Sequence, residues 1–230
     1  VEGDLDIEYD DTQRSAVIDA LQNHVFLLTG GPGTGKTTVV NGIVRAYAQL
    51  NDVRLDPNSY DSETAFPIML AAPTGRAAKR MAETTGLPAS TIHRLLGLSI
   101  DTVDYDPPEL PDGLLIVDEM SMVDTYLFRI LLDAVHPGIT LIMVGDKDQL
   151  PSVGPGQVFA DLLASHALAQ AELTHIHRQD AQSSITTLAH DINGGRLPAD
   201  FGAKQADRSF INCGPGQIQE AVRQVATAAK

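Results

Sequence analysis

The sequence is poor in cysteine and tryptophan, with one Cys and no Trp among 230 residues. A single cysteine excludes a disulfide-stapled fold and a cysteine-based zinc ribbon. No apolar run approaches the roughly 20 residues that cross a bilayer, and no signal-peptide pattern opens the chain. We therefore expect a cytoplasmic protein without a membrane partner. Because the first residue is Val1 and not methionine, we also expect a piece of a longer protein.

Basic residues are scarce as well, since 16 Lys and Arg face 30 Asp and Glu, a formal net charge of −14. That balance by itself disfavours nucleic acid as a partner, because phosphate repels acid. The excess, however, lies in residues 1–11, 51–63 and 101–112, which carry −6, −3 and −5. Residues 73–94 carry +3. Charge alone favours a solvated helix face for this basic segment over a phosphate-binding surface.

Short apolar runs alternate with amphipathic stretches along the first three quarters of the chain. The expected strands are Val25–Thr29, Ile68–Ala72, Leu114–Val117 and Leu141–Val144. The expected helices are Lys36–Leu50, Arg76–Thr85, Thr91–Leu96, Val123–Ala134 and Gln157–Ser165, with a first helix capped by Asp11 and the short one capped by Ser90. This alternation predicts an α/β fold with a parallel sheet and helices on both faces. After about residue 180 we expect a helix at Ser183–Ile192, a short strand near Ser209–Asn212 and a helix at Gln217–Ala229.

A glycine-rich segment from Gly30 to Thr37 matches G-x-x-x-x-G-K-[ST] between an expected strand and an expected helix. Such a loop points its backbone N–H groups at a phosphate, and the helix N-terminus adds positive potential. Lys36 can reach the β- and γ-phosphates, and Thr37 can ligate Mg²⁺. The alternative is a chance glycine-rich turn. The predicted nucleotide-binding residues here are Gly31, Pro32, Gly33, Thr34, Gly35, Lys36, Thr37 and Thr38.

Polar side chains follow two further expected strands. Asp118 and Glu119 end one of them, and Gln149 lies just after another. Ligands of open α/β sheets gather at the carboxyl ends of strands, so Asp118 is predicted to hold Mg²⁺ and Glu119 to orient the attacking water. The Gln149 amide is a candidate γ-phosphate sensor. The alternatives are a helix-capping Asp with a surface Glu, and a solvated loop.

Six segments occur in one order: GGPGTGKTT, APTGRAAKRM, STIHRLLG, VDEMSMVD, VGDKDQLPSVGPG and LTHIHRQ. Together they resemble the motif series of superfamily 1 DNA helicases of the RecD-like branch, from about Asp10 to Pro198. The resemblance implies a RecA-like motor of DNA recombination and repair that uses ATP and Mg²⁺ and moves 5′ to 3′ on single-stranded DNA. It leaves open whether the parent acts alone, with nuclease-complex subunits or within a conjugative relaxase.

The resemblance also implies roles for single residues. Gln13 matches the adenine-reading glutamine, although a lone Gln has a strong structural alternative. Arg178 matches an arginine finger that reaches the γ-phosphate, against the alternative of a surface salt bridge. The residues that match DNA-tracking segments are Pro73, Thr74, Gly75, Arg76, Thr91, His93 and Arg94. Their hydroxyls, backbone N–H groups and cations are suitable phosphate donors.

The expected organisation is one RecA-like domain over residues 1–179 and the start of a second over residues 180–230. Residues 97–113 occupy the place of a small hairpin insert, thought to act as a strand-separating pin. The later motifs V and VI are missing, so we expect nucleotide binding, weak hydrolysis and no unwinding by this chain alone. The competing hypotheses are a nucleotide-gated DNA-binding or assembly module and a P-loop small-molecule kinase.

Overall fold

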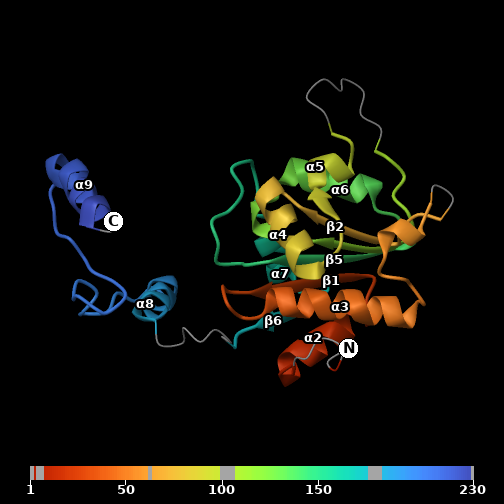
Figure 1. The fold of residues 1–230 in the computed structure, drawn as a ribbon, viewed down its shortest axis with the longest axis horizontal. Coiled ribbons are helices and arrows are strands. Elements are labelled where there is room, and N and C mark those ends of the chain that lie inside the picture. Colours follow the sequence, from red (N-terminus) through yellow and green to blue (C-terminus); the bar gives the residue numbers. More distant parts are fainter. Residues whose placement is uncertain (1–2, 4–7, 62–63, 99–106, 176–182, 229–230) are drawn as a thin grey trace. The chain divides into compact units, whose positions relative to one another are not determined.

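The structure is a computed structural model that describes residues 3, 8–61, 64–98, 107–175 and 183–228 (Figure 1). The chain divides into two compact units, Val1–His177 and Arg178–Lys230. Among the described residues, no helix is both long enough and apolar enough to cross a bilayer.

The first unit is built on a six-stranded sheet of order β3-β2-β4-β5-β1-β6, in which every neighbouring pair is parallel. The strands are β1 Val25–Gly30, β2 Ile68–Ala72, β3 Ala89–Thr91, β4 Gly113–Val117, β5 Ile139–Gly145 and β6 Ala169–Leu173. The four predicted strands are confirmed. The two edge strands, β3 and β6, were not predicted, because an edge strand is covered less and its sequence need not be apolar.

Helices cover both faces of this sheet. Their bounds are α2 Asp11–Gln22, α3 Lys36–Leu50, α4 Gly75–Thr85, α5 Ile92–Leu95, α6 Thr125–Ala134 and α7 Val158–Ser165, with short 3-10 turns η1 Pro57–Ser59 and η2 Met120–Met122. Side chains of α2, α3 and α4 share one buried cluster with Phe26 and Leu28. Those of α5, α6 and α7 share the other with Leu27. Consecutive residues of β1 thus enter opposite cores, which explains the unbroken apolar runs.

Three helix starts differ from prediction because a neighbouring side chain makes the cap, and the starts of α4, α7 and the two helices of the second unit each differ by one residue. Asp10, not Asp11, caps α2 by accepting from the Gln13 N–H at 2.8 Å. Thr91, not Ser90, caps α5, and Ser90 lies in β3. The predicted helix Val123–Ala134 is shorter, because Asp124 accepts from the Leu127 N–H at 2.8 Å and starts α6 at Thr125.

The second unit contains α8 Ser184–Asn193, the 3-10 turn η4 Pro215–Gln217 and α9 Ile218–Ala228. The short strand expected near Ser209–Asn212 is wrong, since this segment is irregular. Side-chain contacts, and not hydrogen bonds between strands, hold this segment in place. The Arg208 guanidinium donates to the Phe201 carbonyl at 2.6 Å, and the Phe201 and Phe210 rings meet edge to face at 5.1 Å.

Candidate nucleotide-binding site

The glycine-rich loop joins β1 to α3 at the carboxyl edge of the sheet. Gly33 and Gly35 have φ angles of 81° and 85°, a region that glycine enters at little cost. Gly30 has no room for a side chain, because a Cβ there would lie 2.6 Å from the Thr34 Oγ1 and 2.8 Å from the Leu173 carbonyl oxygen. The buried Thr34 hydroxyl donates to the Gly31 carbonyl at 2.9 Å. Packing therefore fixes the loop in a curve that suits a phosphate.

Lys36 opens α3, and its ammonium lies inside the curve of the loop. Its Nζ donates to the carbonyls of Gly30 at 2.5 Å and Gly31 at 3.0 Å. Burial lowers the pKa of the Lys36 ammonium, and the negative charges of Asp146 and Asp118 oppose that shift. The lysine is therefore held close to carboxylates that follow β4 and β5. Of the predicted loop residues, Pro32 and Thr37 are exposed, whereas Gly31, Gly33, Gly35 and Thr38 are half-buried.

The acid pair Asp118 and Glu119 follows β4 directly. The Asp118 N–H donates to the Ala71 carbonyl at 2.9 Å, and the Asp118 Oδ1 accepts from the Glu119 N–H at 2.8 Å. Burial raises the pKa of both carboxyl groups, and the charge of Asp118 adds to the rise for Glu119. Glu119 has φ 56° and ψ 38°, a left-handed conformation that is costly for a residue with a side chain. This turn places two carboxylates at one strand end.

The loop after β5, residues 146–149, carries the predicted sensor. Gln149 is exposed, and its N–H donates to the Asp146 carbonyl at 3.2 Å. Asp146 itself is buried and accepts from the Asp148 N–H at 3.0 Å. The negative charge of Asp146 opposes the lowering of the Lys36 pKa by burial.

Two charged residues near the site were not singled out from the sequence. Asp146 is the first polar residue after the apolar run of β5, which is the signal that marks Asp118 after β4. Arg80 of α4 lies one helical turn after Arg76. Its positive charge opposes the rise that burial causes in the pKa of Asp118 and of Glu119. Both residues belong to the electrostatic surroundings of the acid pair.

Gln13 is buried beside the glycine-rich loop. Its Nε2 donates to the Thr34 carbonyl at 3.4 Å, and its Oε1 accepts from the Asp10 N–H at 3.3 Å. Tyr9, from the same stretch, donates its hydroxyl to the Thr38 carbonyl at 3.2 Å. Gln13 therefore supports the loop and the cap of α2 through both ends of its amide.

The two segments predicted to contact DNA lie side by side. They follow neighbouring parallel strands, in which Ala72 of β2 is paired with Thr91 of β3. The Thr74 hydroxyl accepts from the Ala77 N–H at 3.2 Å, and the Thr91 hydroxyl accepts from the Arg94 N–H at 3.1 Å. The residues that lie exposed are Gly75, Arg76, His93 and Arg94, and Pro73 is half-buried.

Two predictions lie wholly or partly outside the described residues. Arg178 is one of them. The other is the hairpin at residues 97–113, of which only the two ends are described. At the second end, Leu110 is buried, and its carbonyl accepts from the His136 Nε2 at 2.9 Å.

The parallel sheet, the loop between β1 and α3 and the acid pair after β4 together define a P-loop NTPase with a RecA-like fold, which is a nucleotide-binding fold. The chain belongs to the AAA domain family, whose model matches residues 8–216.

Curated relatives place the chain within that class more closely, and a solved structure shares its fold. It is 40% identical over 205 residues to the ATP-dependent RecD2 DNA helicase of Deinococcus radiodurans, covering 86% of this chain and 26% of that protein. It is 37% identical over 222 residues to the RecBCD enzyme subunit RecD of Mycolicibacterium smegmatis, covering 86% and 38%. The Pif1 helicase structure from Candida albicans matches with a TM-score of 0.60 at 20% identity, covering 91% of this chain and 50% of that one.

These relatives confirm the resemblance to RecD-like helicases that the motif order indicated. The chain spans about a quarter to two fifths of the length of the two relatives named above.

Proposed function

We propose that this chain is the ATP-hydrolysing motor core of a DNA helicase that moves along single-stranded DNA in the 5′ to 3′ direction. The observation that carries the proposal is electrostatic. Lys36, on the phosphate loop, lies within the field of the three acidic side chains Asp118, Glu119 and Asp146. A lysine, a curved loop and carboxylates at one sheet edge suit phosphoryl transfer from a nucleoside triphosphate to water.

Each residue of the site has a distinct role in this proposal. The loop N–H groups and Lys36 hold the β- and γ-phosphates, and Glu119 orients the attacking water and accepts its proton. Gln149, exposed after β5, contacts the γ-phosphate, and Gln13 supports the loop next to the adenine. The arginine finger that the resemblance assigns to Arg178 stays a prediction, since Arg178 lies outside the described residues. Residues 1–179 are then a first RecA-like domain, and residues 180–230 are the start of a second.

The oxygen donors of this site fit Mg²⁺. Thr37 offers an exposed hydroxyl at the start of α3, and Asp118 offers a carboxylate at the end of β4, which is separated from β1 by β5 in the sheet. Hard oxygen ligands of this kind suit Mg²⁺, which keeps several waters and uses few protein ligands. Bound there, the ion would neutralise charge that develops on the phosphate oxygens.

Single-stranded DNA is proposed to cross the adjoining ends of β2 and β3. Arg76 and Arg94 supply cations, and backbone N–H groups at the starts of α4 and α5 supply further donors. Each ATP cycle would change the grip of this surface relative to the second domain of the parent. The parent would act in DNA recombination and repair, and nuclease-complex subunits are proposed partners.

The experiment is ATP hydrolysis by the chain with and without a dT oligonucleotide. Lys36→Ala should lower the rate at least about 100-fold, because an oriented transition-state donor is lost. Arg129→Ala is the matched control, since Arg129 pairs with Asp133 on α6 at 3.8 Å, away from the proposed DNA surface, and should leave the rate near wild type. A rate unchanged by oligonucleotide would favour an assembly module, and a phosphorylated small molecule would favour a kinase.

A further inference from the structure

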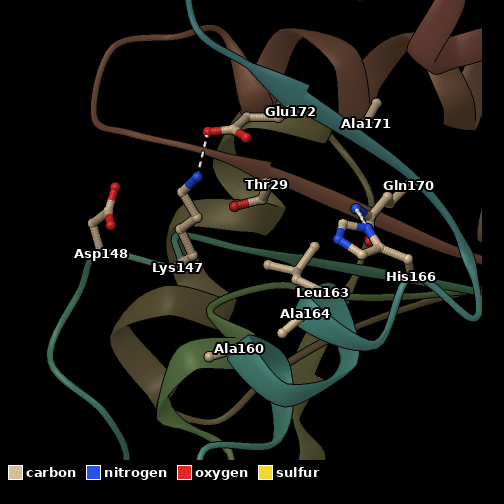
Figure 2. A pocket seen from close by; sticks show the side chains of 10 residues that line it. All are labelled: Thr29, Lys147, Asp148, Ala160, Leu163, Ala164, His166, Gln170, Ala171 and Glu172. Atoms are coloured by element: carbon tan, nitrogen blue, oxygen red, sulfur yellow. Dashed lines mark hydrogen bonds and ion pairs between the residues drawn. The ribbon is translucent and has the colours of Figure 1, made fainter.

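A pocket of about 570 Å³ lies between α7 and the edge strand β6 (Figure 2). Its floor is the sheet, with Thr29 from β1 and Gln170 and Glu172 from β6. One wall is α7, and the loop that carries Lys147 and Asp148 closes one end. Its volume falls within the roughly 300–1,000 Å³ of small-molecule sites.

Packing of α7 explains why this part of the sheet stays open. Phe159 presses on β5 at Gly145, where a Cβ would lie 2.7 Å from its ring. Leu163 of the same helix reaches the buried core, but Ala160 and Ala164 beside the pocket are too short to fill the space toward β6. Four of the lining residues are apolar: Ala160, Leu163, Ala164 and Ala171.

Thr29 is the polar group in this pocket that the fold does not satisfy. The residue is 3% exposed, and its Oγ1 is buried without a hydrogen-bond partner among the described residues. Thr29 is paired in register with Glu172, but the Glu172 carboxylate is taken by Lys147 at 2.7 Å. In Figure 2 the Thr29 hydroxyl is turned toward the loop that carries Lys147. Buried hydroxyls are nearly always bonded, so an unpaired one at a pocket indicates a ligand group.

The charges of the pocket define the class of ligand. Lys147 and Glu172 neutralise each other, and the Gln170 amide is within 3.1 Å of the His166 Nδ1. Asp148 then leaves a negative charge, which disfavours an anion. We propose that this pocket binds a small uncharged planar ring with a carbonyl acceptor beside an N–H donor. The ring would lie against Leu163 and Ala164. Once the flexible Lys147 side chain moves aside, the Thr29 hydroxyl would donate to the carbonyl, and the Glu172 carboxylate, released from the lysine, would accept from the N–H.

An occupant of this pocket would touch the loop that leads to Gln149. Lys147 and Asp148 line the pocket, and Gln149 is the next residue. A ligand held there would change ATP turnover, a consequence that rests on the proposed function. Binding itself is independent of that proposal and is measured without nucleotide.

The test is an NMR titration of the chain, labelled at its Ala and Leu methyl groups, with benzamide as the probe. Saturable shifts of the Leu163 and Ala164 methyls are expected. Benzoate, which has the same shape and a negative charge, should bind several-fold more weakly. Uracil is a third probe, because benzamide and a nucleobase both present a carbonyl acceptor beside an N–H donor. Saturation by uracil alone would identify a nucleobase as the ligand.

Two variants locate the site. Thr29→Val should weaken benzamide binding about three- to tenfold through the lost hydrogen bond, without loss of stability, because the hydroxyl has no partner in the fold. Ala164→Phe fills the pocket from an exposed position and should abolish binding, whereas the exposed Ala167→Phe beside it should not. No saturable shift with benzamide or uracil, benzoate binding as tightly as benzamide, or affinity unchanged in both pocket variants would each overturn the proposal.

Discussion

At the scale of single residues, the chemistry of the site depends on how burial changes the pKa values of its acidic and basic side chains. Burial raises the free energy of ionising both Asp118 and Glu119, and the negative charge of Asp118 adds to that cost for Glu119. Lys36 offsets part of this cost with its positive charge. A base whose pKa lies above the ordinary value of a carboxyl group takes a proton from water more readily.

Glu119→Gln should separate binding from hydrolysis. The variant keeps the shape of the side chain but cannot accept a proton, so turnover should fall about 100- to 1,000-fold while nucleotide affinity is retained. Because the folded-state pKa of Glu119 is raised, its stabilising contribution is present below the unfolded pKa and is lost as pH rises through the folded pKa. Near neutral pH the variant should therefore melt no lower than wild type. Turnover close to wild type would contradict the role of Glu119.

The pH profile of hydrolysis follows from the same two carboxyl groups. In the proposed mechanism both must be ionised for turnover, and burial raises the pKa of each above its ordinary value. The rate should thus fall on acidification at a higher pH than a solvent-exposed Glu would produce. Initial rates of ATP hydrolysis, measured at saturating ATP across a series of buffers, give the pH at which the rate falls. In Asp118→Asn the fall in rate should move to lower pH, since the negative charge that adds to the raised pKa of Glu119 is gone.

At the scale of elements, the junction of β1 and α3 is where close packing matters most. Gly30 has the Thr34 hydroxyl and the Leu173 carbonyl within 3 Å of any added Cβ, whereas Gly31 has nothing within 4 Å. The two adjacent glycines therefore make a matched pair for the same substitution.

Gly30→Ala should destabilise the fold by about 1–3 kcal/mol, because the loop and β6 must shift to admit a methyl group. It should also weaken nucleotide binding. Gly31→Ala should change the free energy of unfolding by less than about 0.5 kcal/mol. Urea denaturation monitored by circular dichroism measures both. Equal losses in the two variants would show that loop flexibility, and not the contact at Gly30, sets the outcome.

Sequence patterns predicted the buried elements well and the edges poorly. Strands β2 and β4 are apolar on both faces, so composition alone identified them. Strand β6 has alternating half-exposed positions, and its pairing with β1 depends on residues far away in the chain. The acid pair and the predicted sensor loop lie where the sequence places them, directly after the apolar runs of β4 and β5. The unpaired hydroxyl of Thr29 was not foreseeable, since it results from how α7 crosses the sheet.

At the scale of the whole molecule, the net charge of −14 sets how the chain meets DNA. The acid excess lies outside the segments that follow β2 and β3, so the proposed DNA surface is locally basic on an acidic protein. The basic surface attracts DNA phosphates at short range, and the net negative charge of the protein repels them at long range. Binding of DNA should therefore depend strongly on how far salt screens these charges.

Binding of a fluorescent dT oligonucleotide should be weak and should fall at least about tenfold between roughly 50 and 200 mM salt, as expected for a few phosphate contacts. Arg76→Ala and Arg94→Ala should each weaken binding and flatten the salt dependence. Arg129→Ala removes the same charge from α6, where Arg129 pairs with Asp133 at 3.8 Å, and is the control. Fluorescence anisotropy measures all four proteins. Tight binding unaffected by salt would place the DNA surface elsewhere.

The position of the Lys36 ammonium has a kinetic consequence. Because its Nζ is bonded to the carbonyls of Gly30 and Gly31, an arriving triphosphate must take the lysine away from two acceptors that are part of the same loop. Capture is therefore an exchange of partners and not a simple addition. We therefore expect encounter and locking to be separate steps, with a rate for the second that does not rise with nucleotide concentration.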